Sequence, residues 1–154
     1  MGARYDSDVV AWASEQAALL RAGKLSQIDI ENIAEEIEDV GKSEKRELAS
    51  RMAVLLAHLL KWKFQPTHRG KSWELTIKGQ RDLIVRRLNK TPSLKSAFSD
   101  PEWLADVWFD ARADASKETG IGLDIFPEDS IWTTDTILSN EFYPDCCLLY
   151  TSDA

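Results

Sequence analysis

The sequence predicts an all-α fold, an antiparallel helical bundle of about five main helices with short extra turns. Apolar residues recur at three- and four-residue spacing in several segments, which is the period of an amphipathic helix. No segment alternates apolar and polar residues with the period of two that a half-buried strand shows. The connections between segments are short, so consecutive helices are expected to pack antiparallel.

The first helix is expected to begin at a polar cap, Asp6 or Ser7, and to run to about Ala22. Gly23 suits the position just past a helix end, where a left-handed backbone is common. The apolar side of this helix includes Val9, Trp12, Ala13, Leu19 and Leu20.

Two helices are expected next, one over residues 28–40 and a long one that begins at Ser43 and reaches about residue 64. Gly41 is interpreted as the stop between them, and Pro66 ends the second because proline lacks an N–H. The shorter helix has an isoleucine face that includes Ile30, Ile33 and Ile37. The long helix has the stripe Leu48, Met52, Leu55, Leu56, Leu59 and Trp62.

The remaining helices follow proline and glycine signals. Ser72 is expected to cap a helix to about Lys90, and residues 91–98 form a short turn. Asp100 followed by a proline is expected to open a helix to about residue 119, and residues 134–139 form a last short helix. The stripe of the helix after Ser72 is Trp73, Ile77, Gln80, Ile84 and Leu88; that of the helix after Asp100 is Leu104, Val107, Trp108, Ala111 and Ala115.

Composition favours a soluble, cytoplasmic globular chain. The 154 residues are 44% hydrophobic and 29% charged, which suits one domain of ordinary size. No apolar run approaches the roughly 20 residues that cross a bilayer, and the N-terminus lacks the apolar core of a secretory signal, so no membrane contact is expected. A single helical domain is expected over residues 1–145. Residues 146–154 are expected to be a non-native or disordered tail, with the only cysteines at Cys146 and Cys147.

Charge is distributed unevenly around a net value of −7. Residues 61–95 hold ten Lys/Arg and two Asp/Glu, a net charge of +8, and residues 96–154 hold two and thirteen, a net charge of −11. Acidic and basic helices can neutralise each other within one bundle. An anion or nucleic-acid site and an acidic protein partner are the two other interpretations of the basic block.

Motifs spread along the chain resemble one known family. They are Glu31-Asn32, Glu35-Glu36-Ile37-Glu38, His58-Leu59-Leu60-Lys61-Trp62, Ser72-Trp73, Gln80-Arg81 and Pro92-Ser93-Leu94. Together they resemble the bacterial domain-of-unknown-function family 29, over about Tyr5 to Pro144. The resemblance implies an all-helical bacterial domain and implies no activity.

Polar residues border the apolar stripes. If the helices over 28–40 and 43–64 form an antiparallel hairpin, three glutamates, two arginines, a histidine and a glutamine can cluster. Three interpretations are open: a structural network that fixes helix register, a metal site made by the three glutamates with the histidine, or an acid–base or anion site made by the histidine with an arginine. The catalytic candidates are His58, Glu35, Arg51, Arg81 and Gln80, and the metal alternative is Glu31, Glu35, Glu38 and His58.

A second candidate is the run of basic and aromatic residues after the long helix. Basic residues interleaved with aromatic rings can grip a phosphate backbone and stack bases. The tryptophans lie on apolar stripes, which favours a place in the core. The candidate binding residues are Lys61, Lys63, His68, Arg69 and Lys71.

The function expected from these patterns is a non-enzymatic interaction module. Its basic 61–90 surface would contact an acidic protein partner or nucleic acid, and no cofactor is expected. The alternative is a metal-dependent hydrolase or nuclease with a carboxylate and histidine site in the bundle. Glycine-rich phosphate loops and nucleophile motifs are absent from the sequence.

Overall fold

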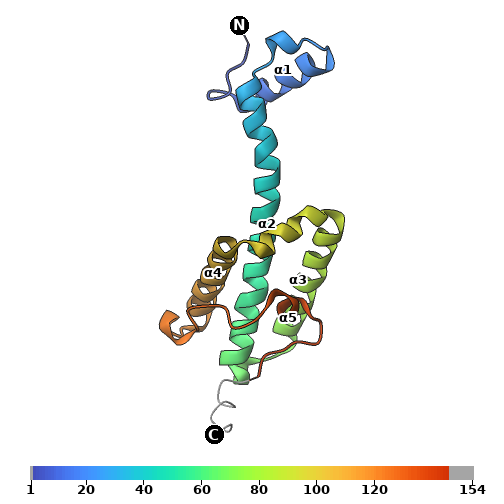
Figure 1. Cartoon of the computed structure of the whole chain (residues 1–154). Coiled ribbons are helices and arrows are strands. Elements are labelled where there is room, and N and C mark those ends of the chain that lie inside the picture. Colours follow the sequence, from blue (N-terminus) through green and yellow to red (C-terminus); the bar gives the residue numbers. More distant parts are fainter. Residues whose placement is uncertain (1, 146–154) are drawn as a thin grey trace. The chain divides into compact units, whose positions relative to one another are not determined.

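The fold is all-α, as predicted (Figure 1). The computed structural model describes residues 2–145, and within them no residue is in a strand. The tail predicted for 146–154 lies outside the described residues. The α-helices are α1 (Val9–Arg21), α2 (Ile30–Phe64), α3 (Lys71–Lys90), α4 (Pro101–Thr119) and α5 (Thr134–Leu138). Short 3₁₀ helices join them: η1 (Leu25–Gln27), η2 (Pro66–His68), η3 (Pro92–Ser99) and η4 (Leu123–Ile125).

The described residues divide into two compact units. The first runs up to Ser43 and the second begins at Glu44. The first unit contains α1 and the beginning of α2, and the second contains the rest of α2 and all later elements. A single domain over 1–145 stays a prediction.

Both ends of α1 are set by local chemistry. The side chain of Asp8 caps the helix by accepting a hydrogen bond from the N–H of Ala11 at 3.1 Å. The cap is therefore Asp8 rather than Asp6 or Ser7. Gly23 has a φ of 73°, the left-handed conformation predicted for it just beyond the helix end.

The expected break at Gly41 is wrong. α2 continues through it, so the two helices predicted over 28–40 and 43–64 are one element of 35 residues. Gly41 does not have a positive φ, and Lys42 to Lys45 carry side chains that a helix tolerates. An isolated glycine costs a helix only about 1 kcal/mol, and the helical residues on both sides of Gly41 outweigh that cost.

Replacing Gly41 with alanine is expected to stabilise α2. A Cβ built at Gly41 has no heavy atom within 4 Å, so the substitution removes backbone entropy from the unfolded chain without a clash. A gain of about 0.5–1 kcal/mol should slow amide exchange at residues 41–45 roughly two- to fivefold. Gly120→Ala is the control, because Gly120 has a φ of 79° and alanine there should destabilise the end of α4. Unchanged exchange near residue 41 would contradict a continuous α2.

The predicted N-cap residue is wrong for α3 and is confirmed for α4. Gly70, rather than Ser72, occupies the N-cap of α3, and no side chain caps that end. Asp100 caps α4 as predicted by accepting from the N–H groups of Glu102 and Trp103 at 3.0 and 3.4 Å. Gly120 ends α4.

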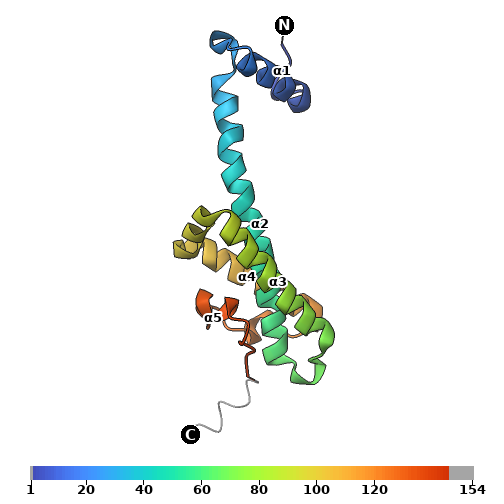
Figure 2. The ribbon, with the colours of Figure 1, turned by 90° about the vertical axis from the view of Figure 1, so that its right-hand side faces the viewer.

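The hydrophobic core belongs to the second unit. Figures 1 and 2 both show α3 and α4 alongside the second half of α2. Arg81 of α3 donates to the carbonyl oxygen of Ile137 in α5. The leucine stripe of α2 is the centre of this core, and Leu48, Leu55 and Leu59 have no exposed surface. Ile84 of α3 and Ala111 of α4 pack against the same cluster, and alanine allows close helix approach. Most residues of the stripes predicted for these three helices are thus in the core, whereas Trp73, Gln80 and Leu104 are only partly buried.

The isoleucine face of the first unit was predicted to be apolar surface packed in the bundle, but two of its isoleucines are largely exposed. Ile30 and Ile37 are 65% and 67% exposed. Trp12 is the only buried apolar side chain among the described residues up to Ser43. Among the described helices, none is long and apolar enough to span a membrane.

Candidate functional site

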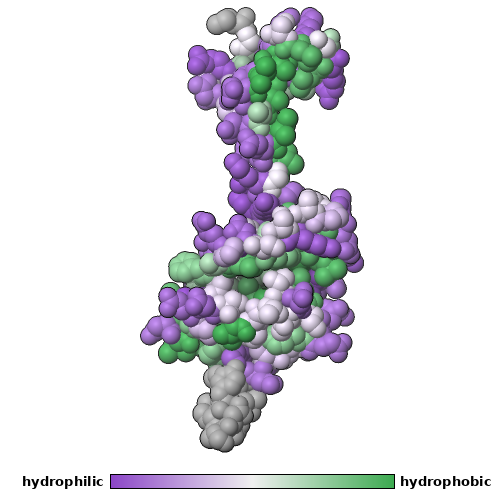
Figure 3. Space-filling model, viewed as in Figure 1, coloured by the Kyte–Doolittle hydropathy of each residue, from purple (hydrophilic) through white to green (hydrophobic). Residues whose placement is uncertain are grey.

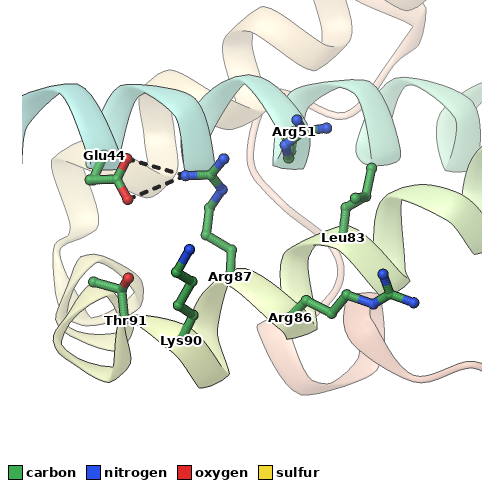
Figure 4. A pocket seen from close by; sticks show the side chains of 7 residues that line it. All are labelled: Glu44, Arg51, Leu83, Arg86, Arg87, Lys90 and Thr91. Atoms are coloured by element: carbon green, nitrogen blue, oxygen red, sulfur yellow. Dashed lines mark hydrogen bonds and ion pairs between the residues drawn. The ribbon is translucent and has the colours of Figure 1, made fainter.

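A basic groove lies between α2 and α3 in the second unit (Figure 4). It has a volume of about 370 Å³. Four of its lining residues are cationic and one is acidic. The lining residues are Glu44, Arg51, Leu83, Arg86, Arg87, Lys90 and Thr91.

The helix stripes explain why these cations face the groove. α3 turns Ile84 and Leu88 into the core, which leaves Arg86 and Lys90 on its exposed side. α2 buries Leu48 and Met52 and leaves Arg51 at the edge of the stripe. The groove is therefore formed by the polar borders of two helices whose apolar faces meet.

Glutamates of α2 already bind part of the arginine cluster. The Nη1 atom of Arg87 donates to both carboxylate oxygens of Glu44, at 3.3 and 3.2 Å, as Figure 4 shows. Glu47 lies 3.6 Å from Nη2 of Arg87 and 3.0 Å from Arg51. These contacts show that the groove has the geometry to hold a carboxylate.

Two cations of the groove remain available. Within residues 2–145 the structure records no ion pair for Arg86 or Lys90, and both side chains are exposed. Leu83 beside them is 42% exposed and offers an apolar contact. A guanidinium and an ammonium next to an apolar surface suit the carboxylates or phosphates of a partner.

Three of the five basic residues predicted to bind a partner are used inside the fold. Lys61 and Lys63 are only 5% and 3% exposed. Lys63 donates to the carbonyl oxygen of Asp145 at 3.2 Å. Arg69 donates to the carbonyl oxygen of Trp62 at 2.6 Å and lies over its ring, 5.2 Å from the centroid.

His68 and Lys71, the other two, are exposed. His68 is within hydrogen-bonding distance of Thr67, and Lys71 pairs with Glu74 at 3.5 Å. The binding role of all five residues stays a prediction. The groove cations Arg86, Arg87 and Lys90 lie off the apolar stripe of α3, but no motif in the sequence distinguishes them from the other cations of that helix.

His58 belongs to a partly buried polar cluster with partners that were not predicted. Its Nδ1 lies 2.9 Å from the carbonyl oxygen of Val54 and so carries the proton. Its Nε2 can then accept from Nζ of Lys61 at 3.4 Å, and Lys61 also forms a salt bridge with Glu118. The Lys61 ammonium is 5.2 Å from the centroid of the Trp73 ring. Neither Arg51 nor Arg81 has a recorded hydrogen bond to His58 in the described part of the chain.

This cluster should make the second unit sensitive to acid. Burial lowers the pKa of His58, and the hydrogen bond from Lys61 lowers the pKa of Glu118. The unfolded chain therefore takes up a proton at His58 near pH 6.5 while the folded chain does not, so stability falls as pH drops below about 6.5. Glu118 adds a further loss below about pH 4.5, for the same reason.

The measurement is the free energy of unfolding by guanidinium chloride between pH 7.5 and 4. His58→Gln should flatten the slope between about pH 6.5 and 5, because the titrating group is gone. His68→Gln is the matched control, since His68 is exposed, and it should leave the slope unchanged. Equal slopes for all three proteins would contradict the assignment.

Arg81 and Gln80, which are adjacent on α3, differ in their hydrogen bonding. Arg81 is 1% exposed and donates to the carbonyl oxygens of Ile137 at 2.9 Å and Phe142 at 2.6 Å. The Oε1 atom of Gln80 is buried and has no recorded hydrogen-bond partner among the described residues. Arg81 holds the chain after α5 against α3, and burial lowers the pKa of its guanidinium.

The hairpin assumed for the cluster of glutamates and histidine is not present, because α2 is one continuous helix. Glu31, Glu35 and Glu38 belong to the first unit and His58 to the second. No turn interrupts α2 between Glu38 and His58. Within residues 2–145, no group of three or more His, Cys, Asp or Glu is placed to hold a metal ion. The described residues thus offer no ligand set for the metal-dependent alternative.

Comparison with known proteins gives one match. The family model described as Domain of unknown function DUF29 matches residues 4–143. The chain belongs to this family. The family resemblance found in the sequence is therefore confirmed over nearly the whole DUF29 chain. No curated protein and no solved structure matched it.

Proposed function

We propose that this DUF29 protein is a non-enzymatic interaction module that binds an acidic segment of a protein partner in the groove between α2 and α3. The observation that carries the proposal is the excess of cations at the groove, where four lie with a single lining carboxylate. The hydrogen bonds from Arg87 to Glu44 support the proposal, because an arginine of the groove already binds a carboxylate of this chain.

Charge favours a protein segment over nucleic acid. Double-stranded DNA carries about one negative charge per 1.7 Å and needs an extended basic surface. The four cations of the groove have Glu44 and Glu47 beside them. The chain as a whole has a net charge of −7, which repels a long polyanion.

The test is fluorescence anisotropy of a labelled glutamate- and leucine-rich peptide at low salt. Binding should weaken as salt rises, because exposed ion pairs are screened. Arg86→Glu combined with Lys90→Glu should reduce the affinity about tenfold or more, since each site changes from attraction to repulsion. Circular dichroism should show unchanged helix content, because both side chains are exposed.

The matched control is Lys78→Glu combined with Lys95→Glu. Both lysines are exposed residues outside the groove lining, and the change in net charge is the same. The control should retain binding. Tighter binding of an oligonucleotide than of the peptide, lost with Arg86 and Lys90, would assign the groove to nucleic acid. If both double variants lost affinity for the peptide equally, the effect would be one of net charge alone. That result would contradict binding in the groove.

A further inference from the structure

The first unit has an apolar groove on its surface and almost no buried core. The groove lies between α1 and the beginning of α2 and has a volume of about 350 Å³. Figure 3 shows hydrophobic residues gathered over this part of the chain. Among the lining residues, Val9 and Leu20 of α1 are 47% and 43% exposed, and Ile37 and Val40 of α2 are 67% and 66% exposed.

Polar contacts hold the two walls of this groove. The Trp12 indole donates to Asp29 at 3.0 Å, and the N–H of Asp29 donates to the side chain of Gln16 at 2.7 Å. The Tyr5 hydroxyl donates to Glu36 at 2.6 Å, and this bond raises the pKa of Tyr5 to about 12. The groove is therefore preformed by hydrogen bonds, whereas its apolar surface stays open.

An open apolar surface of this kind needs a covering element. Chains below about 40 residues rarely bury enough apolar surface to be stable alone and are commonly completed by association. The first unit spans residues 1–43, slightly above that length, and buries one apolar side chain among its described residues, Trp12. A helix is the natural occupant, because the two walls are themselves helices with apolar residues at three- and four-residue spacing.

The charges around the groove define the chemistry of that helix. Residues 1–43 carry four Lys/Arg and nine Asp/Glu, a net charge of −5. Glu31, Glu35 and Glu38 all lie about 150–170° around α2 from the mean direction of its groove-lining residues, so they are on the far side of the helix. Glu36 lines the groove itself. A second copy of the chain would bring two acidic units together, but lysines or arginines beside an apolar stripe would complement Glu36 and the net charge of −5.

We propose that the groove between α1 and α2 of the first unit binds a basic amphipathic helix of a partner protein. The apolar stripe of that helix packs on Leu20, Ile37 and Val40, and a flanking cation meets Glu36. This surface is separate from the groove between α2 and α3, so either proposal can fail without the other.

The test uses a labelled amphipathic peptide of leucine and lysine with heptad spacing and its leucine and glutamate counterpart. The lysine peptide should bind the full chain and the glutamate peptide should not. Ile37→Asp should weaken binding about tenfold or more, because it puts a charge in the apolar contact. Leu75→Asp is the control for an exposed leucine, since Leu75 is 58% exposed on α3, and it should bind like the wild type.

A second pair of variants tests the charge at the groove. Glu36→Gln keeps an acceptor for the Tyr5 hydroxyl and should weaken binding of the lysine peptide about two- to fivefold at low salt, whereas Glu35→Gln on the far side of α2 should not. Three results would overturn the proposal: equal binding of both peptides, no effect of Ile37→Asp, or a dimer of the chain that Ile37→Asp dissociates. The last result would assign the groove to a second copy.

Discussion

Arg81→Met is expected to destabilise the second unit by about 2–4 kcal/mol, because one buried and one partly buried carbonyl oxygen lose their donor. The guanidinium of Arg81 donates to Ile137 and Phe142, and it lies 5.4 Å from the centroid of the Tyr143 ring. Methionine can fill much of the same volume but donates nothing. The expected loss is therefore the cost of leaving the carbonyl groups unsatisfied rather than the cost of a cavity.

Guanidinium chloride unfolding followed by near-ultraviolet circular dichroism measures this loss. Lys78→Met is the control on the same helix, because Lys78 is exposed, and it should change stability by less than about 0.5 kcal/mol. Hydrogen exchange should also become faster in the segment after α5 in Arg81→Met. If Arg81→Met unfolded like the wild type, Arg81 would not be what attaches that segment to α3.

Leu59→Ala is expected to cost about 2–5 kcal/mol, because it leaves a cavity in a close-packed core. Leu59 has no exposed surface and lies in the stripe of α2 on which α3 and α4 pack. The same kind of truncation at Ile37, which is 67% exposed in the first unit, should cost less than about 0.5 kcal/mol.

The difference between the two truncations separates a filled core from an open surface. Thermal unfolding of Leu59→Ala, Ile37→Ala and the wild type gives both values in one experiment. A large loss for Ile37→Ala would mean that the isoleucine face of α2 is already packed in the free chain. That result would also remove the basis for a partner helix on the first unit.

Hydrophobic periodicity was sufficient to predict the helices of the second unit. The stripes from Leu48 to Leu59 and from Val107 to Ala115 are buried as expected, because a helix with one apolar face has to cover it. Periodicity failed at Gly41, where a single glycine was too weak a signal to end a helix. It also cannot tell whether an apolar face is covered by the same chain or by another, which is why Ile37 was expected in the core.

The polar residues were harder to place. Lys61 and Arg69 looked like surface cations, but their charged ends find Glu118 and backbone carbonyl groups inside the fold. Such pairings join residues as far apart as 75 positions in the chain, and no local pattern reveals them. The cations at Arg86 and Lys90 were within the basic 61–90 segment but had no distinguishing motif. They line a groove only because α3 packs on α2, which places Arg51 and Glu44 on its opposite side. The sequence alone does not show this packing.

The proposal that the groove between α2 and α3 receives an acidic protein segment can be tested most directly by nuclear magnetic resonance. Amide shifts of the labelled protein are followed while the glutamate- and leucine-rich peptide is added at low salt. The account predicts that the largest changes lie in residues 44–51 and 83–91, which line the two sides of the groove. Changes concentrated in residues 61–73, with the groove residues unmoved, would contradict it.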